Sequence, residues 1–114
     1  MNSKSKFRTT VLYRDFFQDF FLEQPDKVKA RNIWTLELVE DLERIPDTYL
    51  KSIKNSDGLY EIRVQSGRKI LRFFCFFDKD KLFVLNGFHK KTRKTPRKEI
   101  EKALKIKKEY ERSR

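Results

Sequence analysis

The chain has 114 residues, of which 38% are hydrophobic and 39% charged, and it contains only three Gly and three Pro. This length and composition predict one small, charge-rich globular domain over residues 1–114 and exclude a two-domain enzyme. Its 28 Lys and Arg against 17 Asp and Glu give a net charge of +11, which predicts a polyanionic partner, above all nucleic acid.

The excess positive charge belongs to the second half of the chain. Residues 1–57 carry ten basic and ten acidic side chains, whereas residues 58–114 carry eighteen basic and seven acidic ones. We therefore expect the first half to be mainly scaffold and the second half to present an anion-binding face.

The sequence also bears on location and on cysteine chemistry. No apolar run approaches the roughly 20 residues that span a bilayer, because Arg72 and Asp78 interrupt the longest one. The N-terminal residues lack a secretory signal, which predicts a cytoplasmic protein with no membrane partner. The lone Cys75 between two phenylalanines excludes an internal disulfide and a Cys-based zinc site, and predicts a buried thiol.

The first half predicts one strand and two helices. Residues 7–13 (FRTTVLY) are rich in β-branched and aromatic side chains, which is typical of a strand. Four phenylalanines between residues 16 and 21 share one stripe of a short helix that ends near Pro25. Residues 26–45 predict an amphipathic helix. Its expected buried arc consists of Val28, Trp34, Leu38, Val39, Leu42 and Ile45, while Ile33 and Leu36 fall outside it as a candidate partner-binding strip.

The second half predicts three strands and a last helix. After a turn at 55–58, the segments 59–65, 70–77 and 82–88 predict an antiparallel meander whose middle strand is covered on both faces. Thr95 and Pro96 predict the start of a basic helix whose apolar arc docks on the sheet. The order β-α-α-β-β-β-α predicts an α+β fold: a compact antiparallel sheet of about four strands, packed by two N-terminal helices and one C-terminal helix.

Arg72 is the residue of the meander that most needs an explanation. An arginine in an apolar strand is costly to bury, so its guanidinium either leaves the sheet to meet solvent or a phosphate, or forms an internal ion pair with Glu61. The meander can also bring Arg63 within reach of Arg72. Two adjacent guanidinium groups favour an anion between them, although an accidental surface pair is equally compatible with the sequence.

The densest basic segment, residues 87–98, joins the last strand to the last helix. It contains the sole histidine, His89, a side chain type that exchanges a proton near neutral pH, and Phe88, which could stack on a base. The candidate RNA-binding residues of this segment and of the preceding turn are Arg68, Lys69, Phe88, Arg93, Lys94 and Arg97.

Cleavage of RNA needs a base that takes the 2′-OH proton, cations that hold the phosphorane, and an acid for the departing 5′ oxygen. The sequence shows no clustered carboxylates, paired histidines or Gly-rich phosphate loop, so we expect neither a metal nor a cofactor. Neighbouring cations help a lysine to lose its proton, which makes Lys90 or Lys91 a candidate base beside His89.

Three segments in this order and spacing resemble one protein family. They are DGLYEIRVQSG at 57–67, RFFCFFD at 72–78 and LNGFHKKTRKTPRKEIEKA at 85–103. Over about residues 7–110, the chain resembles the RelE/ParE toxin superfamily of bacterial type II toxin–antitoxin systems, and in particular its phage-derived, HigB-like branch.

This resemblance implies a toxin that cleaves mRNA in the ribosomal A site without a metal, and a helix-turn-helix antitoxin as its partner. It implies that Arg63 and Arg72 bind the scissile phosphate, and that Lys90 and Lys91 supply charge stabilisation or proton transfer. Two positions depart from the RelE branch. The last helix offers only Tyr110 as an aromatic group, and Glu61 stands where that branch has a lysine. An incomplete acid–base set fits an enzyme that relies on the ribosome to position its RNA.

Two other functions stay open on the sequence alone. The same fold serves a non-enzymatic, ParE-like inhibitor of DNA gyrase, since fold does not fix function. A relative that binds RNA without cleaving it would show salt-sensitive binding and no growth arrest.

Overall fold

The computed structural model describes residues 6–89 and 96–114, which form three helices and five strands. In chain order they are β1 (Thr9–Leu12), α1 (Phe16–Leu22), α2 (Asp26–Asp41), β2 (Leu50–Ser52), β3 (Tyr60–Ser66), β4 (Lys69–Asp78), β5 (Lys81–His89) and α3 (Arg97–Ser113). None of these helices has the length and apolar character needed to cross a membrane. Every element predicted from the sequence is present, with ends displaced by a few residues.

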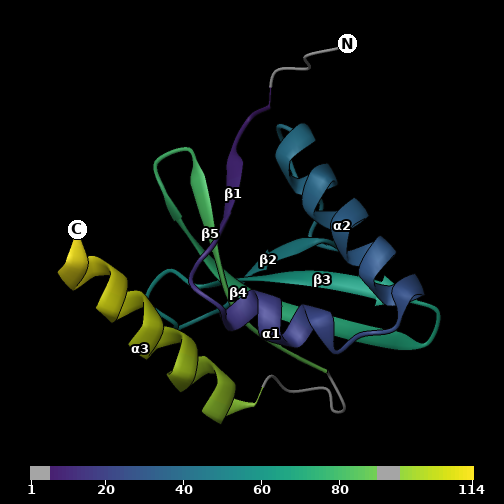
Figure 1. Ribbon diagram of the computed structural model, residues 1–114. Helices are drawn as coiled ribbons and strands as arrows, with labels where there is room; N and C mark the ends of the chain where they lie inside the picture. The colour runs from purple at the N-terminus through teal and green to yellow at the C-terminus, as the bar shows by residue number, and fades with distance from the viewer. Residues whose placement is uncertain (1–5, 90–95) are drawn as a thin grey trace.

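The strands form one sheet in the order β1-β5-β4-β3-β2 (Figure 1). β3, β4 and β5 make the predicted antiparallel meander, which confirms the α+β class. β1 runs parallel to β5, so the five-stranded sheet is mixed, whereas the sequence predicted an antiparallel sheet of about four strands. β2, which pairs antiparallel with β3, is missing from the sequence prediction because three residues are too few to show a period.

β4 is the central strand, and both of its faces are covered as expected. Leu71, Phe73 and Cys75 point into a core shared with residues of α1 and α2, whereas Phe74 and Phe76 point into a second core shared with α3. Figure 1 shows α2 and α3 on opposite sides of the strands. Cys75 is fully buried, and burial raises the pKa of its thiol, which confirms the predicted buried cysteine.

The buried face of α2 differs from the predicted arc. Val28 and Val39 are buried as expected, but the residues between them on this face are Asn32 and Thr35, both almost fully buried. Trp34 and Leu42 are 39% and 38% exposed. α2 packs on the sheet through the stripe at i, i+4, i+7 and i+11, and the two middle residues of this stripe are polar. A prediction of the buried face from hydrophobicity alone was therefore wrong.

α2 also ends earlier than predicted. Asp41 is its last residue, and Leu42 already has an extended backbone (φ −96°, ψ 132°), whereas the apolar pattern continues to Ile45. Ile33 is half exposed and Leu36 packs against the core, so the two residues of the candidate partner strip have different environments.

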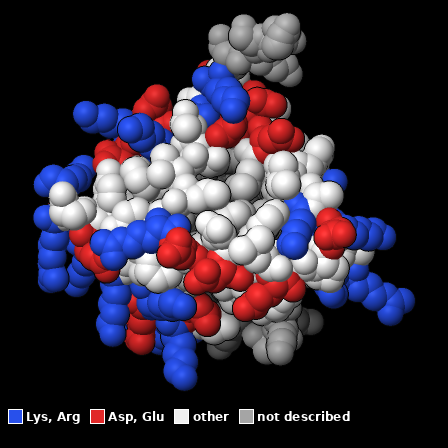
Figure 2. Space-filling model, viewed as in Figure 1, with Lys and Arg blue, Asp and Glu red and all other residues white. Residues whose placement is uncertain are grey.

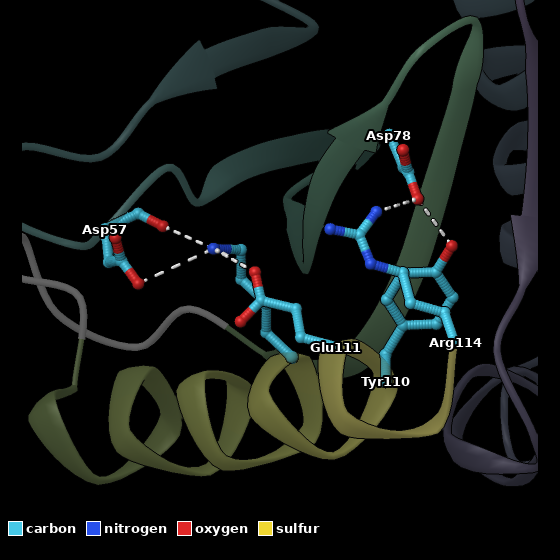
Figure 3. Close-up of polar contacts among 6 residues, drawn as sticks. Asp57, Asp78, Tyr110, Glu111 and Arg114 are labelled. Atoms are coloured by element: carbon cyan, nitrogen blue, oxygen red, sulfur yellow. Dashed lines mark hydrogen bonds and ion pairs between the residues drawn. The ribbon is translucent and has the colours of Figure 1, made fainter.

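α3 is tied to the sheet by polar contacts at two places (Figure 3). Near its C-terminus, Tyr110 Oη donates a hydrogen bond to Asp78 Oδ2 at 2.6 Å, and Arg114 Nη1 donates to the same oxygen at 3.0 Å. One turn earlier, Lys107 Nζ donates to the Asp57 carbonyl oxygen at 2.9 Å. These contacts hold the end of α3, which the sequence left free to fray. Its start lies at Arg97, one residue later than predicted, and Thr95 is outside the described residues.

The Asp78 contact predicts how stability responds to pH. The hydrogen bond from Tyr110 lowers the pKa of Asp78 and raises the pKa of Tyr110, and Arg114 further lowers that of Asp78. The Asp78 contribution is therefore present above the ordinary Asp pKa of about 3.9 and is lost as pH falls through the lower folded value.

In the Tyr110→Phe variant the pKa of Asp78 returns toward its ordinary value. We therefore expect the free energy of unfolding of this variant to fall less than that of the wild type between neutral and acid pH. Urea unfolding at a series of pH values measures this difference. Tyr49→Phe serves as the control, since it removes the same atom from the loop before β2. Identical pH profiles for Tyr110→Phe and the wild type would contradict the assignment.

Candidate functional site

The central strands place three sequence-predicted site residues in one row. Arg63 on β3 is directly opposite Arg72 on β4, and Arg72 is directly opposite Phe88 on β5. Residues directly opposite in an antiparallel sheet share a face, and Phe88 packs in the core under α3. The expected juxtaposition of Arg63 and Arg72 is therefore present, on the α3 face of the sheet.

Arg72 is buried, with 4% of its surface exposed, and its Nη1 forms an ion pair with Glu61 Oε1. Of the two alternatives that the sequence left open, the internal ion pair is confirmed, and the exit of the guanidinium into solvent is wrong. Glu61 is itself only 5% exposed. The diagonal position of Glu61 and Arg72 across β3 and β4 lets the two charges meet without leaving the sheet.

The electrostatics of the row follow from this burial. Burial lowers the pKa of Arg72, the charge of Glu61 opposes that change, and the charge of Arg63 adds to it. Arg63 is half-buried, and within the described part of the chain its side chain forms no ion pair with a carboxylate. Arg63 is therefore the member of the row whose guanidinium is available to an anion.

Phe88 and His89 are not placed as the sequence suggested. Phe88 is buried and stacks on Phe74 with ring centroids 5.2 Å apart, so it is part of the core and does not offer a face to a base. The ring of His89 lies 5.1 Å from that of Phe20 in α1, on the opposite face of the sheet from Arg72.

A β-bulge explains the position of His89. Opposite the two steps from Phe73 to Cys75, β5 takes three steps, from Gly87 to Val84. The extra residue reverses the alternation of the side chains that follow, so His89 faces α1. Gly87 lies at this bulge, where a Cβ would be 2.5 Å from the Phe73 ring and 2.8 Å from the Phe20 ring.

Three of the other predicted RNA-binding residues lie among the described residues. Arg68 is exposed in the turn between β3 and β4, and Lys69 is exposed at the first position of β4. Arg97 is exposed at the start of α3 and pairs with Glu101 at 3.6 Å. Lys90, Lys91, Arg93 and Lys94 lie outside the described residues.

A group of residues on α2 was missed by the sequence analysis. Lys27, Arg31 and Trp34 line a cleft of about 510 Å³ against the β3–β4 turn. A second cleft of about 240 Å³ shares Arg31 with the first and reaches Arg63. The spacing i, i+4, i+7 of Lys27, Arg31 and Trp34 places them on one stripe of a helix. This spacing is the sequence pattern from which the group could have been predicted. The first half of the chain, expected to be mainly scaffold, thus also contributes cations to the basic surface.

The charge distribution agrees with this placement. In the view of Figure 2, basic side chains lie mainly around the periphery, including the edge where the start of α2 meets the β3–β4 turn. Among residues 6–89 and 96–114 there is no group of three His, Cys, Asp or Glu side chains suited to hold a metal ion.

Tyr110 is far from the Arg63–Arg72 row. Its hydroxyl contacts Asp78, six residues along β4 from Arg72 and thus roughly 20 Å away at about 3.3 Å per residue. The aromatic group of the last helix therefore stabilises the attachment of α3 and does not reach the row.

Comparison with known families assigns the chain to one of them. Residues 19–108 match the family described as phage-derived protein Gp49-like (DUF891). The match covers most of the chain, including every strand of the meander, and the chain belongs to this family. It agrees with the phage-derived part of the resemblance noted from the sequence. No curated protein matches the chain.

The ion pair between Arg72 and Glu61 predicts the effect of removing one partner. Arg72→Ala leaves the buried Glu61 carboxylate without this guanidinium, which lowers the free energy of unfolding by about 3–5 kcal/mol. Replacing both residues by leucine restores much of that loss, because the double variant buries no charge. Arg97→Ala, the exposed control, changes stability by less than about 1 kcal/mol. Chemical denaturation of the four proteins checks the prediction, and equal stability of Arg72→Ala and Arg97→Ala would contradict it.

Proposed function

We propose that this Gp49-like protein is the toxin of a type II toxin–antitoxin system and acts as a metal-independent, ribosome-dependent mRNA endonuclease of the RelE/ParE superfamily, in its HigB-like branch. The observation that carries the proposal is the pairing of Arg63 with Arg72 at the centre of the sheet. Family membership, the RelE-like α+β fold and the net charge of +11 support it.

In this proposal the two arginines have different tasks. Arg63 holds the non-bridging oxygens of the scissile phosphate, and their added negative charge in the transition state strengthens the contact. Arg72 is a positioning residue, because its guanidinium is held by Glu61 beneath the surface and its place on β4 sets Arg63 directly opposite it. Lys90 and Lys91 supply further charge or the proton transfer, as the resemblance implies.

The bond changes define the products. The 2′ oxygen loses its proton to a base and forms a bond to phosphorus, the bond from phosphorus to the 5′ oxygen breaks, and that oxygen receives a proton. One fragment ends in a 2′,3′-cyclic phosphate and the other begins with a 5′-hydroxyl. His89 faces away from Arg72, and the Tyr110 hydroxyl donates a hydrogen bond to Asp78. Neither residue is therefore placed to take the proton of the 2′-OH group. This supports a dependence on the ribosome to align the 2′-OH with the phosphate.

Arg63→Ala tests the proposal. We expect ribosome-dependent cleavage to fall by about 10- to 100-fold, because a hydrogen bond to a charged group is worth about 1.5–3 kcal/mol. Growth arrest after induction should be relieved in parallel. Arg112→Ala, which removes an exposed arginine at the far end of α3, should cleave like the wild type.

Mapping of transcript 5′ ends after a short induction is the measurement. New ends at codon positions that disappear in Arg63→Ala support the nuclease. Intact transcripts with double-stranded DNA breaks would contradict it and favour a gyrase inhibitor, and RNA binding without arrest would favour an inactive relative.

The proposal includes an antitoxin with a helix-turn-helix domain as partner. An apolar groove of about 370 Å³ between α1 and α2 is the surface proposed for it, and Leu22 and Ile33 are its most exposed lining residues. Figure 2 shows that the surface between these helices is largely uncharged. Exposed apolar patches on otherwise charged proteins commonly mark protein interfaces.

Ile33→Asp tests this surface. Because a carboxylate in the groove opposes burial of apolar side chains from a partner, we expect it to weaken the complex with the protein encoded beside the toxin by at least about tenfold. Ile33→Leu is the matched control and should bind normally. The measurement is co-purification of the tagged toxin, together with the growth of cells that express both proteins. Normal rescue of growth in the Ile33→Asp strain would rule out this groove.

A further inference from the structure

The two clefts beside α2 form one continuous basic surface. The larger one, of about 510 Å³, and the smaller one, of about 240 Å³, share Arg31 and Gln65 between them. We call them together the Arg31 cleft. It lies between the start of α2 and the β3–β4 turn, and its smaller part reaches Arg63.

Arg31 is fixed in position at the centre of this cleft. Its Nε donates a hydrogen bond to the Gln65 carbonyl oxygen at 3.1 Å, and its guanidinium carbon lies 3.9 Å from the centre of the Trp34 ring. No ion pair occupies Arg31 within the described residues. The terminal nitrogens are thus pre-oriented donors, which is the arrangement that recognises a phosphate group.

Trp34 provides an aromatic surface next to these donors. Trp34 is 39% exposed as a residue, although it has the largest apolar side chain of α2, and its ring meets that of Tyr49 edge-on with the ring centroids 5.9 Å apart. The turn opposite is open, since a Cβ at Gly67 would meet no atom within 4 Å. A flat ring that is partly exposed beside fixed cations is the combination by which proteins bind unpaired nucleotides.

The lining of the cleft selects for negative charge. Lys27 and Arg31 contribute cations from α2, and the described residues that line its two parts include no Asp or Glu. The side chains of Gln65 and Ser66 and backbone groups of the turn supply hydrogen-bond partners of the kind that base edges use. A phosphate-linked chain is favoured over a neutral ligand here, because each phosphate can replace a counterion at these cations.

We propose that the Arg31 cleft binds unpaired nucleotides of single-stranded RNA, with a base stacked on the part of the Trp34 ring that the Arg31 guanidinium leaves exposed and the adjoining phosphates held by Arg31 and Lys27. Arg63 is a lining residue of the smaller cleft on β3, and its side chain shares the α3 face with Arg72, so in this proposal the bound strand passes around β3 from the cleft toward the proposed cleavage site. The choice of RNA as the anion rests on the proposed function. The cleft serves as a subsite that holds the strand beside the reacting phosphate.

The sole tryptophan of the chain makes the test direct, because the emission of Trp34 reports on the cleft alone. Titration of the purified full-length protein with a short single-stranded oligouridylate should quench this emission. Fluorescence anisotropy of the same RNA, labelled at one end, gives the affinity. We expect the affinity to fall about tenfold in Arg31→Ala and in Trp34→Ala, and to change little in Trp34→Phe, which keeps an aromatic ring. Arg112→Ala is the charge-matched control, and circular dichroism confirms that each variant is folded.

The outcomes separate this inference from the proposed function. Quenching by RNA that is weakened in Arg31→Ala supports the cleft, even if transcripts stay intact and the nuclease proposal fails. Unchanged Trp34 emission on RNA binding, or wild-type affinity in Arg31→Ala, overturns the cleft even if Arg63→Ala abolishes cleavage. Quenching by a polyglutamate peptide that displaces the RNA would also overturn it, since the cleft would then be a protein-binding surface.

Discussion

The structure depends on the burial of β4 between two layers. Residues 71–76 of this strand are all buried, and side chains alternate between the core with α1 and α2 and the core with α3. Arg72 is the charged member of this run, so it requires a partner of opposite sign within the sheet, and Glu61 on β3 provides it. A slip of one residue between β3 and β4 would send Arg72 to the other face and separate the pair. The ion pair therefore helps to fix the register.

That register is what sets Arg63 opposite Arg72. Arg72 is held below the surface by a carboxylate, whereas Arg63 is half-buried on β3 without an ion pair among the described residues. The buried charge is thus structural, and the accessible charge is the one that can meet a ligand. Arg31 approaches the β3–β4 turn from α2, so both halves of the chain contribute cations near this turn.

Much of the fold and part of the site could be predicted from local patterns. The order of strands and helices follows from periods of two and 3.6 residues, and the predicted meander allowed Arg63 to lie within reach of Arg72 without fixing the register that pairs them. The position of His89 could not be predicted in this way. It depends on one extra residue in β5, and a bulge has no signature in the alternation of side chains before it.

The sequence by itself determined the secondary structure, the double-sided burial of β4 and the surplus of cations, because each of these is a property of neighbouring residues. Only the tertiary structure decided which face of α2 is buried, whether Arg72 meets Glu61 or solvent, and which cations lie together. These outcomes depend on contacts between residues distant in the chain. Trp34 shows the difference: its hydrophobicity predicts burial, but packing of α2 through Asn32 and Thr35 leaves its ring at the surface beside Arg31.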